Sequence, residues 1–349
     1  MLKLRKILIF ELLLLFVIAV SGCTGGQNVK KSLEQIHTGT EGIAIGFLPN
    51  NPPDEIHVEQ QGTDTFDVIL DIRNRGAYPQ PDDSGGIASS KGKVFLSGYD
   101  TNIISFRVKD ARSGQQGTSS GGLSFGDLSK MSLEGKSIIN LNGGQDVIAF
   151  TGSVDGNKLN VEKYEPTFLA TACYYYETAA GQSVCIDPDP YSTISEKKVC
   201  EVKDVSLSGQ GAPIAVTKID EQAFAYKTQF RITIKNAGNG EVMTQEAAEN
   251  KCDPLGNKKV ERDDIDKVNL ETVKIGEQGL TCGPFADAAV KGASGAVRLI
   301  NGEGSFICDM PKDMYGRSTS AYTTPMLIKL SYGYRTTAEK IVRIIKEKT

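Results

Sequence analysis

Residues 1–22 differ from the rest of the chain in their pattern of apolar and charged positions. Three basic residues occur among the first six, and an apolar run from Ile7 to Val20 follows them, broken only by Glu11. The uninterrupted part, which begins at Leu12, fits the apolar region of a secretory signal peptide and is too short to cross a bilayer core by itself. We therefore predict that residues 1–22 form an export leader.

Residues 23–42 are polar, and alternation with a period of two begins at Ile43. In the segment Phe66 to Gly76 (FDVILDIRNRG), every second residue from Phe66 to Ile72 is apolar, and most of the residues between them are charged. This pattern is typical of a strand with one buried face in an antiparallel sheet. We interpret residues 23–42 as a polar tether that precedes a β-sheet body.

Similar alternating runs recur toward the C-terminal end, separated by segments rich in glycine, proline and asparagine. Helical patterns are confined to short stretches at residues 32–37, at residues 123–131 and within residues 243–268. The repeated strand pattern predicts an all-β fold of antiparallel β-sandwiches. Because domains commonly contain about 100–200 residues, we place one sandwich at residues 43–195 and a second at residues 196–349.

One strand in each half carries the same sequence pattern. Val68 to Gly76 (VILDIRNRG) and Phe230 to Gly238 (FRITIKNAG) alternate apolar residues and end in Asn-x-Gly, at an offset of 162 residues. Asparagine and glycine both accept the positive φ with which a chain can leave a strand. The repeat resembles the second strand of immunoglobulin-like, cell-adhesion-related domains of prokaryotic surface proteins. The resemblance implies two tandem immunoglobulin-like sandwiches, each with insertions beyond the ~100 residues of a minimal domain.

The overall composition argues against some classes of partner. The net charge is −4 and the pI is near 5.5, so we expect no nucleic-acid partner. The hydrophobic content of 39% is that of a globular body. The chain contains no tryptophan, which disfavours a tryptophan-based platform for sugars.

The chain has seven cysteines, of which Cys23 directly follows the leader. In an exported protein the remaining six are expected to form three disulfides. We predict a Cys173–Cys185 pair, because two strands joined by a turn at residues 179–182 would place these cysteines opposite each other. The pairing of the other four stays open: Cys200, Cys252, Cys282 and Cys308.

The leader ends in Val20-Ser21-Gly22-Cys23, which is an aliphatic residue, two small residues and a cysteine. This sequence resembles the lipobox of prokaryotic lipoproteins, and the resemblance implies cleavage after Gly22 and lipidation of the Cys23 thiol. Two alternatives stay open. A plain signal peptide or an uncleaved anchor would leave Cys23 without a role. The position of Glu11 resembles type IV prepilins, although Lys6 stands where that family has a small residue.

The sequence contains no set of residues with the spacing of a catalytic or metal site. Neither His37 nor His57 has a neighbouring nucleophile motif, so we expect no serine–histidine triad, and no cysteine pair has zinc-site spacing. The run Tyr174–Tyr176 is either a stacking surface or part of the core, and the core is the commoner case for aromatic strand residues. Acidic clusters on loops are either calcium ligands or, more commonly, solvated side chains: Asp82-Asp83, Asp187 with Asp189, and Asp263-Asp264 with Asp266.

These observations predict a lipid-anchored protein on the extracytoplasmic face of the cell membrane or the cell surface. We expect a binding or structural module of the adhesion type, without enzyme activity, cofactor or metal. Its partners would be the membrane, through a lipid on Cys23, and an unidentified protein or glycan. Three alternatives stay open: a substrate-binding lipoprotein of a transporter, with strands alternating with long helices, a pilin-like envelope subunit, and a secreted hydrolase.

Overall fold

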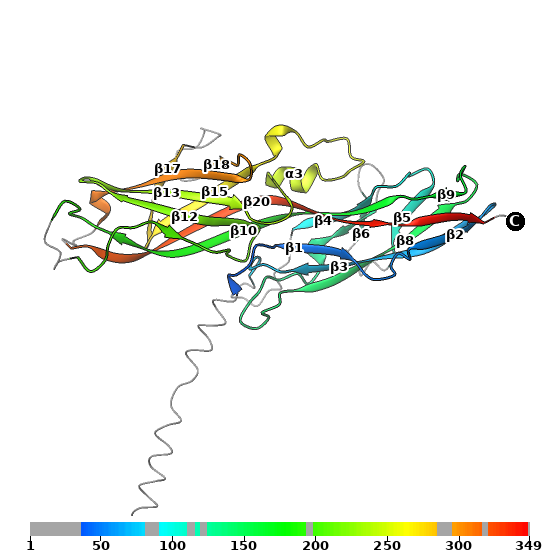
Figure 1. The fold of residues 1–349 in the computed structure, drawn as a ribbon, viewed down its shortest axis with the longest axis horizontal. Helices are drawn as coiled ribbons and strands as arrows, with labels where there is room; N and C mark the ends of the chain where they lie inside the picture. The colour runs from blue at the N-terminus through cyan, green and yellow to red at the C-terminus, as the bar shows by residue number, and fades with distance from the viewer. Residues whose placement is uncertain are drawn as a thin grey trace, which may run out of the picture.

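The computed structural model describes residues 36–80, 91–109, 116–118, 124–192, 198–284, 295–315 and 320–347. They form an elongated body built mainly of strands (Figure 1). The helical elements of the described part are one α-helix, α3 (Gln245–Asn250), and the 3-10 turns η1 (Leu128–Lys130), η3 (Arg262–Asp264) and η4 (Lys312–Tyr315). The predicted all-β fold with antiparallel sheets is confirmed. The leader, Cys23 and Asp82-Asp83 lie outside the described residues.

Two strands of 20 residues each, β10 (Thr167–Ile186) and β20 (Tyr322–Ile341), form the axis of the body. They pair antiparallel along their whole length, from Thr167 opposite Ile341 to Ile186 opposite Tyr322. Further strands extend this pair into a nine-stranded sheet in the order β16-β15-β20-β10-β4-β7-β6, with β14 beside β20 and β18 beside β15. The added strands are β4 (Gly92–Ser97), β6 (Gln116–Thr118), β7 (Ser124–Asp127), β14 (Glu241–Met243), β15 (Lys267–Ile275), β16 (Gln278–Gly279) and β18 (Gly295–Arg298).

Two smaller antiparallel sheets contact the inner face of this long sheet. The first has the order β1-β3-β8-β5, and the second has the order β11-β12-β13-β19-β17. On β10, Phe168 stacks on Phe66 of the first small sheet, and the Thr178 hydroxyl donates to the Ile214 carbonyl of the second at 2.7 Å. The strands are β1 (Ile43–Phe47), β3 (Thr63–Asn74), β5 (Ile104–Val108), β8 (Gln145–Asp155), β11 (Val205–Ser206), β12 (Ile214–Ala223), β13 (Lys227–Asn236), β17 (Thr281–Gly283) and β19 (Glu303–Pro311).

The last strand, β21 (Arg343–Glu347), lies in the sandwich formed mainly by the first half of the chain. It pairs parallel with β2 (Glu55–Glu59) and antiparallel with β9 (Lys163–Tyr164), so the C-terminal end lies beside β2 (Figure 1). The two halves therefore share a sheet and a continuous apolar core. The boundary between residues 195 and 196 stays a prediction, and strand pairing joins the segments on either side of it.

Strand burial follows the alternation in the sequence. In β3, Phe66, Val68, Leu70 and Ile72 are buried, as the pattern predicts. Because every second side chain of a strand points to the same face, one row of apolar residues is enough to attach β3 to the core. Tyr174 and Tyr176 are also fully buried, so two of the three consecutive tyrosines belong to the core.

Four tyrosines lie where the two long strands cross the centre of the body. Tyr174 is opposite Tyr334, and Tyr176 is opposite Tyr332. The Tyr176 hydroxyl donates to the Asn74 side-chain oxygen at 3.0 Å, and the Tyr334 hydroxyl donates to that of Asn236 at 3.0 Å. The two Asn-x-Gly repeats therefore occupy equivalent positions, with one strand end fixed to β10 and the other to β20.

The predicted reason for the repeat glycines, a positive φ, is wrong. Neither Gly76 nor Gly238 has a positive φ, and neither does the asparagine before it. A side chain at Gly76 would collide with the Tyr176 hydroxyl, and one at Gly238 would collide with the Tyr334 hydroxyl. Glycine is needed here because the strand end approaches a buried tyrosine closely.

The predicted Cys173–Cys185 disulfide is wrong. Both residues belong to β10, which continues straight through residues 179–182 without a turn. At about 3.3 Å per residue, the twelve-residue separation corresponds to about 40 Å, far beyond disulfide reach. The structure pairs Cys173 with Cys252, Cys185 with Cys200, and Cys282 with Cys308, at Cα–Cα distances of 6.2, 5.8 and 4.1 Å.

Candidate functional site

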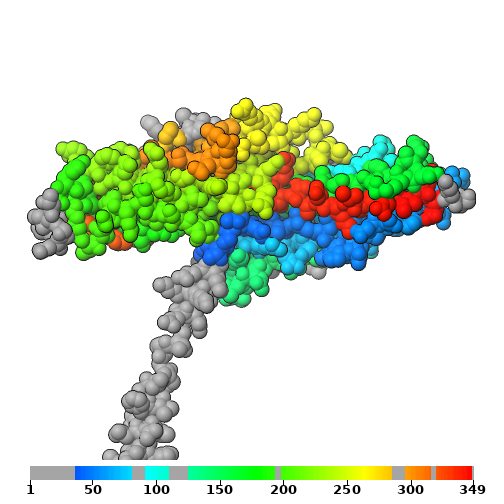
Figure 2. Space-filling view, viewed as in Figure 1, coloured from blue at the N-terminus to red at the C-terminus, as the bar shows by residue number. Residues whose placement is uncertain are grey.

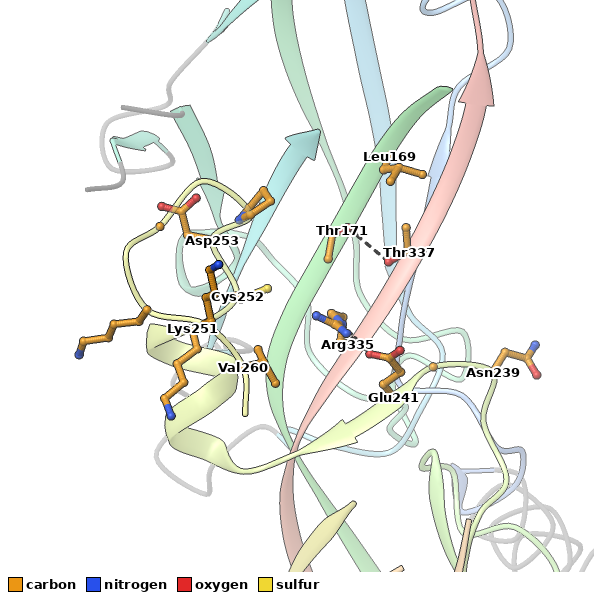
Figure 3. Close-up of a pocket in the computed structure, with 15 residues that line it drawn as sticks. Leu169, Thr171, Asn239, Glu241, Lys251, Cys252, Asp253, Val260, Arg335 and Thr337 are labelled. Carbon is orange, nitrogen blue, oxygen red and sulfur yellow. Dashed lines mark hydrogen bonds and ion pairs between the residues drawn. The ribbon is translucent and has the colours of Figure 1, made fainter. Parts of the chain in front are cut away.

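A polar groove lies on the outer face of the long sheet, next to the centre of the β10–β20 pair (Figure 3). Its volume is about 580 Å³. The floor consists of outward-facing residues of the two long strands, including Thr171, Arg335 and Thr337. The walls are the turn at residues 239–241 and the segment 251–260, which follows α3. We call the whole feature the groove.

The wall that follows α3 is fixed to the floor by apolar packing. Thr244 caps α3, with its hydroxyl accepting from the Ala247 backbone N–H at 3.2 Å. The buried Ala247 and Ala248 pack with Cys173 and Cys252 in a small separate core. Gly333 of β20 permits this approach, because a side chain there would lie 2.7 Å from the Ala248 Cβ.

The Cys173–Cys252 disulfide connects the same wall to β10. The two cysteines are 79 residues apart in the chain, so the bond joins the first half of the sequence to the segment after α3. Figure 3 shows Cys252 between Lys251 and Asp253 on this wall. Covalent attachment to a fully paired strand holds the groove in one shape before any ligand binds, which reduces the entropic cost of binding.

Two of the cations at the groove are already paired. Arg335 donates through Nε to Glu241 Oε2 at 2.7 Å, across the β14–β20 pair. Lys251 donates to both oxygens of Asp264 at 2.8 Å, and this hydrogen bond raises the pKa of Lys251. These two ion pairs fix side chains at the edge of the groove, and they leave Arg335 and Lys251 with little positive charge to offer a ligand.

Lys258 and Lys259 are the cations that remain available. Both are exposed, and neither makes an ion pair or a side-chain hydrogen bond to any described residue. The Asp253 side chain accepts from the Leu255 N–H at 3.0 Å through Oδ1, whereas its Oδ2 is buried without a hydrogen-bond partner among the described residues. A buried acceptor without a donor is costly, so a ligand or water that donates to Asp253 would stabilise the site.

The side chains that line the groove are suited to binding a polar ligand. Its lining contains four basic and two acidic residues, in a chain whose net charge is −4. It contains no histidine and no aromatic residue, and its one cysteine is in a disulfide. The Thr171 and Thr337 hydroxyls, 3.3 Å apart, give the floor further donors and acceptors. Opposite charges side by side on a polar floor suit a charged, extended ligand.

The structure places the other candidate residues away from the groove. Exposed His57 contacts the Glu347 carboxylate through Nδ1. His37 borders a different surface hollow, near the β11 region. The Tyr175 hydroxyl donates to Glu177 at 2.7 Å.

The described acidic clusters are engaged with neighbouring groups. Asp187 accepts from Lys198 at 2.8 Å, and Asp263 pairs with Arg298 at 2.9 Å. Among the described residues, no group of three or more histidine, cysteine, aspartate or glutamate side chains has a metal-binding arrangement.

Apart from Cys252, which was expected to form a disulfide, the sequence assigned no role to the groove residues. Lys258 and Lys259 lie in a polar segment that the sequence marks only as a loop containing Cys252. The floor residues come from β10 and β20, whose pairing is visible only in the structure. The informative signal was Cys252, because a cysteine inside a polar loop of an exported protein indicates that a disulfide attaches the loop to another segment.

No known protein family and no curated protein sequence matches this chain. Two solved structures with very weak similarity come from bacterial surface proteins. One is the C-terminal domain of the Streptococcus pyogenes antigen I/II-family protein AspA, with 9% identity, 88% of this chain and 100% of that chain covered, and a TM-score of 0.18. The other is the collagen binding domain of Erysipelothrix rhusiopathiae surface protein RspB, with 10% identity, coverage of 90% and 99%, and a TM-score of 0.13. TM-scores this low carry no inference about fold or function.

Proposed function

We propose that this protein is a membrane-anchored, extracytoplasmic binding protein without enzyme activity. Its groove holds an extended, acidic segment of a partner protein. In this proposal the leader directs export, Cys23 carries the lipid anchor, and residues 24–42 connect the anchor to the body. The rigid double sandwich then presents the groove to its partner.

Export is supported by the cysteines and by the leader. All six cysteines of the described body are paired in disulfides, which form and persist mainly in oxidising compartments. The basic start and short apolar run of residues 1–22 are typical of secretory leaders, and Val20 to Cys23 resembles a lipobox. Among the described residues, no helix has the length and apolarity needed to span a membrane.

The single observation that carries the choice of ligand is the pair of unpaired lysines at a preformed groove. Lys258 and Lys259 offer two cations without a counter-charge among the described residues, and the disulfide at Cys252 fixes the wall from which they extend. The absence of aromatic residues from the lining disfavours neutral sugars, which commonly stack on aromatic rings. An acidic peptide segment matches the charge of the lysines and can donate backbone N–H groups to Asp253.

The proposal is tested with a labelled oligoglutamate peptide and the intact protein, followed by fluorescence anisotropy. We expect saturable binding that weakens with salt, because exposed charges are screened. The double variant Lys258→Glu/Lys259→Glu should lower the affinity by about tenfold or more, which corresponds to about 1.4 kcal/mol.

The matched control is Lys235→Glu/Lys274→Glu, which makes the same charge change at exposed lysines outside the groove. It should change the affinity much less, because only the long-range charge differs. Equal loss in both variants would show nonspecific charge attraction and would reject the groove as the site. Capture of partners from an envelope fraction by wild type, but not by the groove variant, would then identify the natural ligand.

A further inference from the structure

The segment between η1 and β8 displays aliphatic side chains to solvent. Ile138 is 62% exposed, Ile139 is 92% exposed and Leu141 is 40% exposed. The eight residues 137–144 (SIINLNGG) include no charged residue. We call these eight residues the apolar loop. Exposed aliphatic residues grouped at the tip of one loop mark an interaction surface more often than scattered ones do.

The apolar loop is a defined turn held by its own hydrogen bonds. Ser137 N–H donates to the Asn140 carbonyl at 2.9 Å, and the Asn140 N–H donates to the Ser137 hydroxyl at 3.0 Å. The Asn140 amide also donates to Glu134 and to the Gly143 carbonyl, both at 2.9 Å. Gly143 has a φ of +73°, which a residue with a side chain rarely adopts. The fold therefore maintains the exposure of the isoleucines.

The apolar loop lies beside the first described residues of the chain. The Lys136 ammonium donates to the Thr38 carbonyl at 3.2 Å. A surface hollow of about 750 Å³ is bordered by residues 39–41, by Lys136 and by Leu141. Figure 2 shows this part of the chain, between η1 and β8, projecting on the side where the body begins. Whatever attaches the start of the chain is therefore close to the apolar loop.

The length of the preceding chain limits how far the loop lies from the proposed anchor. Twelve residues lie between Cys23 and Ile36, so thirteen residue-to-residue steps join them. Even a fully extended chain of this length reaches no more than about 45 Å. The region around Ile36 is thus held close to the membrane surface, and the neighbouring loop is within reach of the lipid headgroups.

Cationic side chains accompany the aliphatic ones. Lys136 binds a backbone carbonyl instead of a carboxylate, and Arg73 and Arg75 border the same hollow. Asp71 pairs with Arg73 at 2.7 Å, and Glu41 pairs with Arg75 at 3.0 Å, so the two arginines are partly neutralised. An apolar tip next to a lysine is the combination by which protein surfaces insert into the interface of an anionic membrane.

We propose that the apolar loop docks into the membrane that holds the anchor, with Ile138, Ile139 and Leu141 inserted among the lipids. This inference rests on the proposed anchoring and adds a second attachment point to it. With two points of contact, the elongated body no longer rotates freely on its tether. The loop thereby sets which side of the body faces away from the membrane.

The absence of tryptophan from the chain provides a direct test. In the variant Ile139→Trp, reconstituted as the full chain into vesicles of phosphatidylcholine and phosphatidylglycerol, all tryptophan fluorescence comes from the loop. We expect a blue shift of the emission on reconstitution and a loss of fluorescence with brominated lipids. Fluorescence that iodide quenches fully and brominated lipids leave unchanged would overturn the proposal.

Ile300→Trp is the matched control. Ile300 is 72% exposed and precedes Asn301-Gly302, as Leu141 precedes Asn142-Gly143, and Gly302 also has a positive φ. It follows β18, which lies on the other side of the body from the start of the described chain (Figure 1). Its tryptophan should stay accessible to iodide.

The same vesicles separate this inference from the anchoring itself. Flotation of Cys23→Ser against wild type reports whether Cys23 is needed for attachment, and the tryptophan signal reports whether the loop enters the bilayer. Attachment that depends on Cys23 without lipid quenching at position 139 would reject loop docking and keep the anchor. Quenching at position 139 with attachment independent of Cys23 would keep loop docking and reject the lipid anchor.

Discussion

At the scale of single residues, the Asn-x-Gly repeats show how two distant parts of the chain are fixed to each other. Asn74 is fully buried, accepts from the Gly76 N–H and the Tyr176 hydroxyl, and donates to the carbonyls of Tyr78 and Leu133. Its side chain therefore makes hydrogen bonds to four groups around the strand end, and buried polar groups need such partners. The glycine two positions later leaves room for the tyrosine hydroxyl to reach it.

We predict that Gly76→Ala destabilises the protein by about 2–4 kcal/mol, because the new methyl group collides with Tyr176 and with backbone carbonyls. Urea unfolding followed by circular dichroism measures the change. Gly46→Ala in β1 is the control, since a methyl group there would meet no atom of a non-adjacent residue within 4 Å, and it should be close to neutral. Equal stability of the two variants would contradict the close-packing explanation.

A second variant checks which contact matters at Gly76. Tyr176→Phe removes the hydroxyl, so Gly76→Ala in that background should cost less. The recovery should be partial, because the carbonyls of Gly211 and Glu41 also lie too close to a methyl group at this position. Full recovery would assign the entire effect to the tyrosine.

At this scale the sequence predicted which face of a strand is buried, but it did not predict which distant side chains the strand contacts. Alternation predicted which side chains of β3 are buried, since burial of one face is a local property of a strand. It also detected the equivalence of Asn74 and Asn236. It could not reveal that each asparagine binds a tyrosine about a hundred residues away, because that contact depends on tertiary packing.

At the scale of elements, the disulfides decide which segments are held on the sheets. The chain-entropy relation assigns about 4–5 kcal/mol to a cross-link that closes a loop of 79 residues and about 3 kcal/mol to one that closes 15 residues. Cys173–Cys252 is the long-range link and supports the groove wall. Cys185–Cys200 closes a local loop at the distal end of β10.

We predict that Cys173→Ala/Cys252→Ala lowers the unfolding free energy by about 4 kcal/mol and also weakens oligoglutamate binding, because the groove wall loses its attachment. Cys185→Ala/Cys200→Ala should cost about 3 kcal/mol and leave binding unchanged. Thermal or urea unfolding and the anisotropy assay measure both effects. Peptide mapping without reduction is the independent check, and a Cys173–Cys185 cross-linked peptide would contradict the structure.

The wrong prediction of a turn at residues 179–182, within β10, has a physical origin. Residues 179–182 (AAGQ) are small or polar and look like a turn when the strand is considered alone. In the structure they pair with residues 326–329 of β20, so a neighbour along the whole length keeps the backbone extended. Tertiary pairing overrides local preference in strands, and a single sequence does not contain the identity of the pairing strand.

At the scale of the whole molecule, the two sandwiches depend on each other. β20 and β21 come from the end of the chain, yet β20 pairs with β10 over its full length and β21 lies between β2 and β9. Residues 36–195 alone would expose an edge of β10 that is 20 residues long, together with the apolar residues that β20 covers. Open edges of this kind favour aggregation.

We predict that residues 36–195 and residues 196–349, produced separately, do not fold alone and form a native-like complex when refolded together. The reason is that neither fragment contains both long strands. Size-exclusion chromatography and near-ultraviolet circular dichroism measure assembly. Cooperative unfolding of either isolated fragment would contradict this prediction and would support two independent domains on either side of residue 195.

The position of β21 has a consequence for the order in which the molecule is made. The chain leaves the ribosome, and in the proposed setting crosses the membrane, with its N-terminal end first. β2 and β9 cannot pair with β21 until residues 343–347 have been made, and β10 cannot pair with β20 until residues 322–341 have been made. The earliest part of the body is therefore completed last. A chain that cannot complete its fold until β20 and β21 are available stays unfolded while it is translocated. In the proposed setting, this allows the chain to cross the membrane before it folds.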